Sequence, residues 1–294
     1  MTTPSAVTLA NQIRMGRQIS RRAVVVVEGR DDKLFCEHFV DRAVAKVLVA
    51  PGKENVLEAV RILDADGFLG ISGLVDPDFD GLSGFGVGSA PSPNLLTVDA
   101  HDLDTMLLRS GALGRVLTEF AVRRDCGPSE SDVREMLTLL AAPIGCLRLH
   151  SLRRGLNLRF AGLDYSRVFS RTGGSVDEIT LIQEVKNRTQ RQDISSAELR
   201  TGVAAIREEG HDLWQLCCGD DLLGALCCAL RWWLAGSSAQ QVSAAKIRES
   251  LRLAFGPQDF LGSGVGRQMS FWQEQNPGFR LLLPALGRGA GATP

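Results

Sequence analysis

The sequence predicts an α/β fold, in which a mostly parallel sheet is flanked by helices and followed by a mainly helical C-terminal region. Short β-branched or apolar runs at 24–27, 73–75 and 95–98 are bounded by Gly, Pro or acidic residues. Such runs are typical of strands that are buried on both faces of a parallel sheet. Apolar residues at helical spacing separate the runs, and the pattern after residue 110 is mostly helical. The order of these patterns indicates alternating strands and helices, then a helical region.

Each element in the first part of the chain has its own local signal. We expect strands at 23–28, 46–50, 69–75 and 94–98, and helices at 5–20, 31–42, 53–65 and from 102 onward. Asp31 or Asp32 is suited to begin the second helix, because Asp favours helix N-termini. Pro77 helps to end a strand, since proline supplies no backbone donor. The Gly- and Pro-rich stretch 81–93 predicts a mobile loop that gates access to a site.

The second part of the chain is predicted to be built mainly of helices. They are expected at 111–124, 129–141, 176–188, 195–209, 220–235 and 240–254. The segment 145–170 is mixed and is a candidate for a small hairpin, while Gly and Pro are frequent from residue 256 onward. The last eight residues are expected to be disordered. We therefore predict a sheet domain at 20–110 and a mainly helical accessory or dimerisation region at 111–294.

The composition is that of an ordinary globular protein. The chain has 294 residues, of which 44% are hydrophobic and 23% charged, enough for a substantial core. No apolar run approaches the roughly 20 residues of a membrane span, and the N-terminus lacks a signal segment. We therefore expect a cytoplasmic protein with no membrane partner. The seven cysteines include no Cys-x-x-Cys spacing, which favours reduced thiols over a zinc site.

Charge is distributed unevenly along the chain, although the net charge is only −1. Residues 21–110 have a net charge of −6, and residues 111–294 have a net charge of +3. Phosphate binding near the acidic part would need a metal ion together with basic groups from elsewhere. Arg153, Arg154 and Arg159, within the arginine-rich stretch 148–171, are candidate nucleic-acid contacts. The alternative interpretation of this stretch is a solvated basic face.

Acidic residues follow the predicted strands where a parallel sheet forms its binding sites. Glu28 follows the first strand, Asp76 and Asp78 follow the third, and Asp102 and Asp104 come after the fourth. Because the carboxyl ends of parallel strands share one edge of the sheet, we expect these side chains to converge. Closely packed carboxylates repel one another, and a hard divalent cation removes that cost. The sequence therefore predicts a site for Mg²⁺ or Mn²⁺ with oxygen ligands.

The expected roles follow from two-metal phosphoryl transfer, in which ions roughly 4 Å apart stabilise the attacking and leaving oxygens. We expect Glu28, Asp76 and Asp78 to be catalytic. Glu28 and Asp76 are assigned to one ion, and Asp78 and Asp32 complete the pair. Glu28 is also a candidate general acid/base, which is the alternative to its role as an ion ligand.

Several further residues have two interpretations each. Asp102 and Asp104 are candidate metal ligands, and they are also candidate helix N-caps. Asp80 is a candidate metal contact or a loop cap. His101 is a candidate positioning group beside the metal site rather than a base. Asp221 is a candidate supporting residue, for which a structural role is favoured over a catalytic one.

The acidic pattern resembles the TOPRIM domain of primases, type IA and II topoisomerases, and OLD-family nucleases. The first motif of that family is a strand followed by Glu-Gly, here Glu28 and Gly29, and Asp32 matches the Glu-x-x-x-Asp of the nucleases. The second motif is a strand that ends in Asp-x-Asp, here Asp76-Pro77-Asp78. The resemblance covers residues 20–110. It implies a TOPRIM catalytic domain that cleaves nucleic-acid phosphodiesters with two Mg²⁺ or Mn²⁺ ions.

Two later stretches resemble a subgroup of small TOPRIM proteins that includes the effector subunit of PARIS anti-phage systems. The first is His101-Asp102-Leu103-Asp104-Thr105-Met106. The second is Cys217-Cys218-Gly219-Asp220-Asp221-Leu222-Leu223, which is similar to a Gly-His-Asp-Leu-Leu segment but has Asp220 where His is usual. This resemblance implies a toxic anti-phage endonuclease that cleaves RNA, with transfer RNA favoured and DNA as the alternative. It also implies an ABC-type ATPase partner and an active homodimer.

The alternative hypothesis is a non-catalytic regulatory or interaction subunit of an ATPase complex. The complete acidic set argues against this hypothesis, because a site that has lost its catalytic activity usually lacks one of the acidic residues. A topoisomerase is disfavoured because the single tyrosine, Tyr165, would have to be the nucleophile and the chain has no room for strand-passage domains. A primase would need further domains as well. The glycine-rich stretch 262–267 lacks the Lys-Ser/Thr of a P-loop, so ATP binding is not expected.

Overall fold

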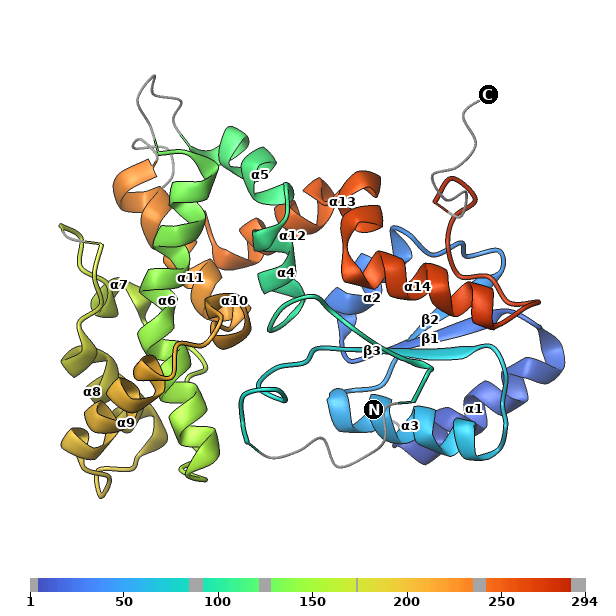
Figure 1. The fold of residues 1–294 in the computed structure, drawn as a ribbon, viewed down its shortest axis with the longest axis horizontal. Helices are drawn as coiled ribbons and strands as arrows, with labels where there is room; N and C mark the ends of the chain where they lie inside the picture. Colours follow the sequence, from blue (N-terminus) through green and yellow to red (C-terminus); the bar gives the residue numbers. More distant parts are fainter. Residues whose placement is uncertain (1–4, 85–91, 122–127, 173, 235–241, 287–294) are drawn as a thin grey trace. The chain divides into compact units, whose positions relative to one another are not determined.

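The computed structural model of the chain describes residues 5–84, 92–121, 128–172, 174–234 and 242–286. The chain forms two compact units (Figure 1). Unit 1 consists of residues 1–76, 89–99 and 256–294, and unit 2 consists of residues 77–88 and 100–255. The last eight residues and most of the predicted loop 81–93 lie outside the described residues.

Unit 1 contains a four-stranded, all-parallel sheet with the strand order β2-β1-β3-β4. The strands are β1 (Ala23–Val27), β2 (Ala45–Val49), β3 (Ile71–Val75) and β4 (Leu95–Thr97). Every residue of β1 and β3 is buried, which explains why their sequences do not alternate between apolar and polar residues; β1 is apolar throughout, and β3 includes one buried polar residue, Ser72. The predicted α/β class, with a parallel sheet flanked by helices and a helical region beyond it, is confirmed.

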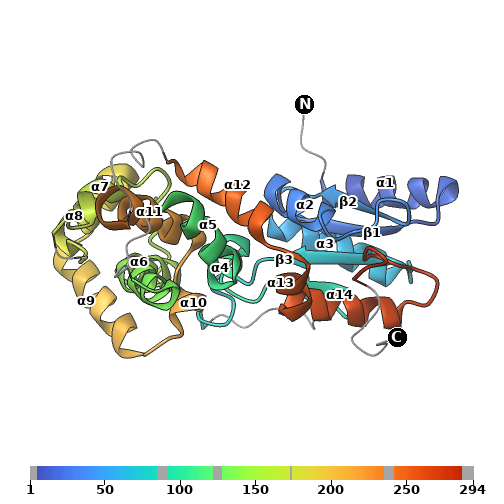
Figure 2. The same ribbon diagram turned by 90° about the horizontal axis from the view of Figure 1, so that it is seen from above.

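Helices cover both faces of this sheet. Figure 1 shows α1 (Ala6–Ile19) and α3 (Lys53–Ala65) below the sheet and α2 (Arg30–Glu37) and α14 (Gly264–Gln275) above it, and Figure 2 gives the view from above. The core on the α1 and α3 side combines these two helices with alternate residues of β1 and β3. Its buried members are Ala6, Leu9, Ala10, Ile13, Val24, Val26, Ala50, Val56, Ala59, Leu63, Ile71 and Val75.

The C-terminal segment returns to the sheet, which the sequence did not indicate. Residues from 256 onward were expected only to be rich in Gly and Pro, but they form α13 (Pro257–Gly262) and α14. Trp272 of α14 is almost fully buried and donates its indole N–H to the Asn94 side chain at 2.8 Å. Asp99, at the end of β4, accepts the first backbone N–H groups of α14. These contacts give the segment a helical fold against β4.

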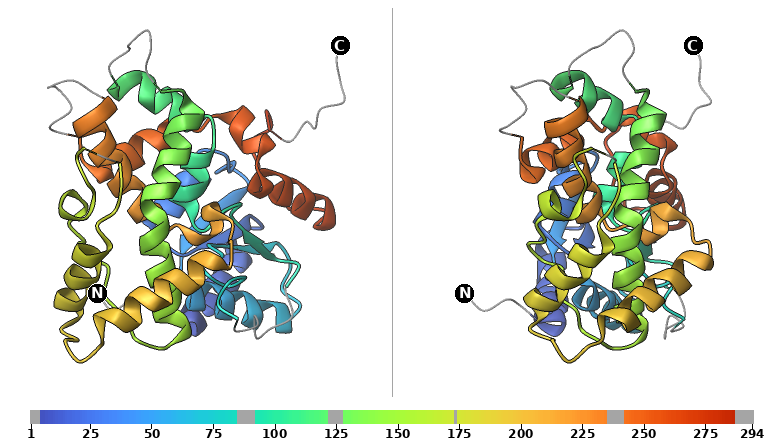
Figure 3. Two further views of the ribbon diagram at one scale, coloured as in Figure 1. Left: turned by 60° about the vertical axis from the view of Figure 1, so that its left-hand side comes forward. Right: turned by 90° about the vertical axis from the view of Figure 1, so that its left-hand side faces the viewer.

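Unit 2 is helical and is built around the long helix α6 (Glu130–Arg153) (Figure 3). The other elements are α4 (Leu103–Arg109), α5 (Ala112–Phe120), α7 (Tyr165–Val168), α8 (Glu178–Thr189), α9 (Ser196–Glu208), α10 (Leu213–Leu216), α11 (Gly219–Ala229), the π-helical turn Leu230–Leu234 and α12 (Ala244–Ala254). Helices α5, α9, α10 and α11 all contact α6. The predicted helices 111–124, 220–235 and 240–254 extend into residues 122–127 and 235–241, which lie outside the described part of the chain.

The length of α6 corrects the sequence-based prediction of a helix that ends at 141. The helix passes through Pro143 and continues to Arg153, so the first part of the segment 145–170 is helical rather than mixed. Proline within a helix costs about 3 kcal/mol. Burial of one large aliphatic side chain recovers roughly 1.5–3 kcal/mol, and α6 buries Leu137, Ile144 and Leu147 among others. Tertiary packing therefore outweighs the local proline signal.

The two compact units divide the chain differently from the predicted ranges 20–110 and 111–294. Helix α4 groups with the helical unit because it packs against α5, α11 and α12. The segment 256–294 groups with the sheet because α14 contacts β4. None of the helices in the described residues is long and apolar enough to cross a membrane.

The packing of α3 on β3 generates a stability prediction. A Cβ atom added at Gly73 would lie 2.9 Å from side-chain carbons of both Val56 and Val60. We expect Gly73→Ala to lower the free energy of unfolding by about 1–3 kcal/mol, because the core has no room to relax. Gly16→Ala in α1 is the matched control, since nothing lies within 4 Å of its added Cβ. Chemical denaturation should show no loss for the control, and equal losses in both variants would contradict the packing argument.

Candidate functional site

Glu28 and Asp76 lie together in unit 1 at the carboxyl ends of the adjacent strands β1 and β3. The carboxylate Oε1 of Glu28 accepts the backbone N–H of Asp76 at 2.9 Å. Both residues are partly buried and directly follow fully buried strands. The hydrogen bond fixes the Glu28 side chain across the strand ends, so the acid is directed along this edge of the sheet and not out into solvent.

Gly29 and Asp32 form the turn that leads from β1 into α2. The N–H of Gly29 donates to Oδ2 of Asp32 at 2.8 Å, so Asp32 closes the first turn of the helix. Gly29 has extended backbone, and an added Cβ would lie 3.3 Å from Asp32 Oδ2. Glu28 and Asp32 are therefore connected through a tight strand-to-helix turn, and one oxygen of Asp32 already has a structural role.

The Asp76-Pro77-Asp78 motif spans the boundary of the two units, and Asp78 belongs to unit 2. Asp78 has a left-handed backbone with φ of 50°, which is uncommon for a residue other than glycine but is tolerated by Asp. Its N–H donates to the backbone carbonyl of His101 at 2.9 Å. Asp80 is exposed, and its N–H donates to the Pro77 carbonyl at 3.0 Å. The segment after Pro77 is thus a structured turn.

Further contacts hold this turn in unit 2. The Phe79 ring packs edge-on against His101, with ring centroids 4.5 Å apart. Arg153 donates two hydrogen bonds to the Leu82 carbonyl and also forms an ion pair with Glu209. The position of Asp78 is therefore set by unit 2 through both backbone and side-chain contacts.

Asp102 caps two helices at once. Its Oδ1 accepts the backbone N–H and the hydroxyl of Thr105 at the start of α4. Its Oδ2 accepts the N–H of Gly219, the first residue of α11, at 2.7 Å. The N-cap interpretation of Asp102 is confirmed by these contacts. Its assignment as a ligand to a magnesium ion stays a prediction.

Asp104 is tied to Arg248 of α12 by an ion pair of 2.6 Å. Arg248 also pairs with Asp220 at 2.5 Å. Burial raises the pKa of the Asp104 carboxyl to about 7, although the Arg248 guanidinium acts in the opposite direction. The basic partner comes from a distant part of the chain and was not found by sequence reasoning. The role of Asp104 as a metal ligand likewise stays a prediction.

Asp221 is completely buried and has a structural set of partners. Arg148 donates to both of its oxygens at 2.7 and 2.9 Å, and the Tyr165 hydroxyl donates to Oδ1 at 2.9 Å. Burial and the neighbouring carboxylate raise the pKa of the Tyr165 phenol. A partly buried tyrosine whose hydroxyl donates its proton to a carboxylate is poorly suited to be a nucleophile. These contacts also show that Arg148 does not serve a solvent-facing basic track.

The predicted nucleic-acid contacts fall into two kinds. Arg153 is partly buried and already bonded to Leu82 and Glu209. Arg154 and Arg159 are exposed, the first at the end of α6 and the second in the segment that follows it. Only these two residues of the predicted three present their side chains to solvent.

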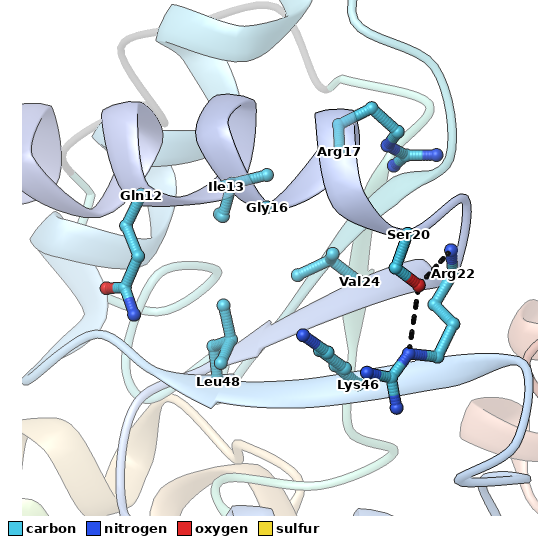
Figure 4. Close-up of a pocket in the computed structure, with 9 residues that line it drawn as sticks. All are labelled: Gln12, Ile13, Gly16, Arg17, Ser20, Arg22, Val24, Lys46 and Leu48. Carbon is cyan, nitrogen blue, oxygen red and sulfur yellow. Dashed lines mark hydrogen bonds between the residues drawn. The ribbon is translucent and has the colours of Figure 1, made fainter.

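A cavity of about 140 Å³ lies between α1 and the beginnings of β1 and β2 (Figure 4). Ile13, Val24 and Leu48 supply apolar walls, and Figure 4 shows Arg22 and Lys46 close together at one side. The predicted acids follow the opposite, carboxyl ends of these strands. This cavity is therefore separate from the acidic site.

Another group of potential metal ligands lies in unit 2. The sequence analysis did not predict these residues as a group. Potential ligand atoms of His101, Asp102 and Cys218 all lie within 4.8 Å of one another. His101 and Asp102 were expected near a magnesium site, but Cys218 was not assigned any role. No sequence spacing signals this group, because Cys218 is more than a hundred positions from the other two residues.

The structure thus brings Glu28 together with Asp76, and Gly29 with Asp32, within unit 1. It brings Asp78 to His101, and it places Asp102 and Asp104 at the start of α4, within unit 2. Asp221 and the arginines belong to other parts of unit 2.

A comparison of the sequence with models of known protein families finds no match, and a comparison with curated proteins finds none either.

The buried partners of Asp221 generate a second stability prediction. Asp221→Asn should lower the free energy of unfolding by about 3–5 kcal/mol, because it leaves the Arg148 charge buried without a counter-ion. Asp220→Asn is the matched control on the neighbouring residue, whose side chain is 68% exposed, and it should cost no more than about 1 kcal/mol. The double variant Arg148→Met/Asp221→Leu should recover much of the loss. Thermal or chemical unfolding measures all three, and similar values for the two asparagine variants would contradict the structural role.

Proposed function

We propose that the chain is a metal-dependent endonuclease that hydrolyses nucleic-acid phosphodiesters. The observation that carries this proposal is the hydrogen bond from the Asp76 N–H to Glu28, which holds two acidic residues together at the carboxyl ends of adjacent parallel strands. This edge is where open α/β sheets form their sites. The resemblance of both acidic motifs to TOPRIM nucleases gives the reaction class.

The residues of this edge fit a hard divalent cation. Glu28 and Asp76 offer carboxylate oxygens, and Asp78 follows two residues further along the chain. Oxygen donors suit Mg²⁺ or Mn²⁺. When bound, such ions polarise the phosphodiester and lower the pKa of bound water. The proposed ligands are Glu28 and Asp76 for one ion, and Asp78 and Asp32 complete the pair of ions.

The protein's own residues supply positioning. The Asp76 N–H orients the Glu28 carboxylate, and the Gly29–Asp32 hydrogen bond holds the turn that follows it. The left-handed backbone of Asp78 is held in place by the hydrogen bond from its N–H to the His101 carbonyl. Pre-set carboxylates need little reorganisation when substrate arrives, which is the usual basis of electrostatic catalysis. Glu28 retains its second candidate role as the general acid/base.

The biological setting is proposed on the resemblance to small TOPRIM effectors. The favoured substrate is RNA, with transfer RNA first and DNA as the alternative. The chain would act as a toxic anti-phage effector in the cytoplasm, as a homodimer, under the control of an ABC-type ATPase. The exposed Arg154 and Arg159 are suited to contact the phosphate backbone outside the acidic site.

The direct test compares the natural chain with Glu28→Gln on transfer RNA, single-stranded RNA and duplex DNA, with and without magnesium or manganese. Glutamine keeps an oxygen that accepts the Asp76 N–H but removes the charge. We expect metal-dependent cleavage that falls by roughly 100-fold or more in the variant, because a pre-set charged group is lost. The substrate that is cut decides between RNA and DNA.

Glu274→Gln is the matched control, since Glu274 is an exposed glutamate on α14 of the same unit. It should cleave like the natural chain. Cleavage that persists in Glu28→Gln would remove Glu28 from the active site. A folded chain that cuts none of the three substrates would overturn the endonuclease proposal for the isolated chain and favour the regulatory subunit of an ATPase complex.

A further inference from the structure

We propose that His101, Asp102 and Cys218 form a binding site for a zinc-type transition-metal dication, with a ligand set that differs from the oxygen-only acidic set. The three residues lie in unit 2, where the N-termini of α4 and α11 meet. They offer one nitrogen, one oxygen and one sulfur ligand within 4.8 Å of one another. No other group of this kind is found among the described residues.

The spacing of the ligands suits a small ion. Zinc binds imidazole, carboxylate and thiolate at about 2.0–2.3 Å, so tetrahedral ligands lie roughly 3.5 Å apart. Atoms at the 4.8 Å limit would move closer by about 1 Å on binding, a side-chain adjustment. The backbone is already in place, because Asp102 joins the starts of both helices.

His101 is held as metal-binding histidines usually are. Its Nδ1 lies 2.8 Å from the backbone carbonyl of Gln215. A carbonyl only accepts, so Nδ1 carries the hydrogen and the neutral ring keeps its lone pair on Nε2. The ring is 3% exposed and is also fixed by Phe79. A carbonyl that orients the ring in this way strengthens the imidazole as a ligand.

Asp102 retains capacity for one more partner. A carboxylate has about four lone-pair positions. Two on Oδ1 are taken by Thr105, whereas Oδ2 accepts a single hydrogen bond, from the Gly219 N–H. A monodentate bond from Oδ2 to an ion is therefore compatible with the double cap.

Cys218 supplies the ligand that selects the metal. Burial, and next to it the Asp102 carboxylate, raise the pKa of the thiol well above its ordinary value. A dication binds cysteine as the thiolate, so the thiol proton is released on binding. The thiolate would then lie at the N-terminus of α11, where negative charge is favoured. Sulfur and imidazole disfavour magnesium, so this site and the acidic site select different ions.

The test uses the full chain and Co²⁺, which reports sulfur ligation by a thiolate-to-metal absorption band. We expect the band in the natural chain and its loss in Cys218→Ser. Cys217→Ser is the matched control. Cys217 is the neighbouring cysteine but not one of the proposed ligands, because it is completely buried and its Sγ lies 3.6 Å from the Thr138 carbonyl. His101→Gln should weaken Co²⁺ binding by at least about 10-fold, because even the loss of a residue that only supports a metal ligand costs about 10–100-fold. Zn²⁺ should displace Co²⁺ and raise the melting temperature of the natural chain.

Two outcomes would overturn the assignment. One is the absence of the band in a folded natural chain titrated with Co²⁺. The other is a band of equal strength in Cys218→Ser and Cys217→Ser, which would place the sulfur ligand elsewhere. The measurement needs neither nucleic acid nor magnesium, so its failure is distinguishable from failure of the proposed nuclease activity.

Discussion

Burial of β1 is the constraint on which unit 1 depends. Its five residues are buried, and the strand pairs on one edge with β2 and on the other with β3. A strand in this position favours apolar residues along its length, and in β1 the first polar residue comes only where the strand ends. Glu28 is that residue. Its hydrogen bond to Asp76 shows that the end of β1 is also the end of β3, so the sheet itself brings the two acids together.

Most other acids near strand and helix ends serve the backbone. Asp32, Asp99 and Asp102 each accept N–H groups at the start of a helix. Helix N-termini expose unpaired N–H groups and carry partial positive charge, which favours carboxylates there. Capping therefore accounts for part of the acids in residues 21–110, and others, such as Glu37, Glu58 and Asp66, form ion pairs with arginines. Glu28 differs from the caps because its partner is the N–H of a neighbouring strand end.

Local patterns were sufficient to predict the strands and much of the helix content. The valine run of β1 and the Pro and Gly residues that end strands act within a few positions. The same reasoning failed where distant residues decide the structure. Helix α6 continues through Pro143 because its apolar face is buried, and α14 forms because Asp99 and Asn94 meet it. Of the glycines at 262–267, Gly262 ends α13, and Gly264 and Gly266 lie in the first turn of the packed helix α14.

The candidate sites divide in the same way. The acids at strand ends were predictable because sheet topology alone places Glu28 beside Asp76. The partners of Asp102 and Asp104 were not, since Gly219 and Arg248 are 117 and 144 positions away in the sequence. The charge pattern and residue spacing of a single sequence do not indicate contacts between residues that are so far apart in the chain. A cysteine with no Cys-x-x-Cys partner appeared inert on spacing alone.

Helix capping and ion binding both use the lone pairs of a carboxylate, and in the proposed zinc-type site Asp102 would do both. The capping hydrogen bonds occupy some of the lone pairs of the Asp102 carboxylate and fix its side chain. They do not cancel its whole negative charge. Water screens the remaining negative charge of Asp102 only weakly, because this residue is partly buried. A thiol proton on Cys218 and a dication are two alternative ways to accommodate that environment. A bound dication would compensate both the carboxylate and the thiolate, whereas without an ion Asp102 is compensated by the helix N-termini and the Thr105 hydroxyl.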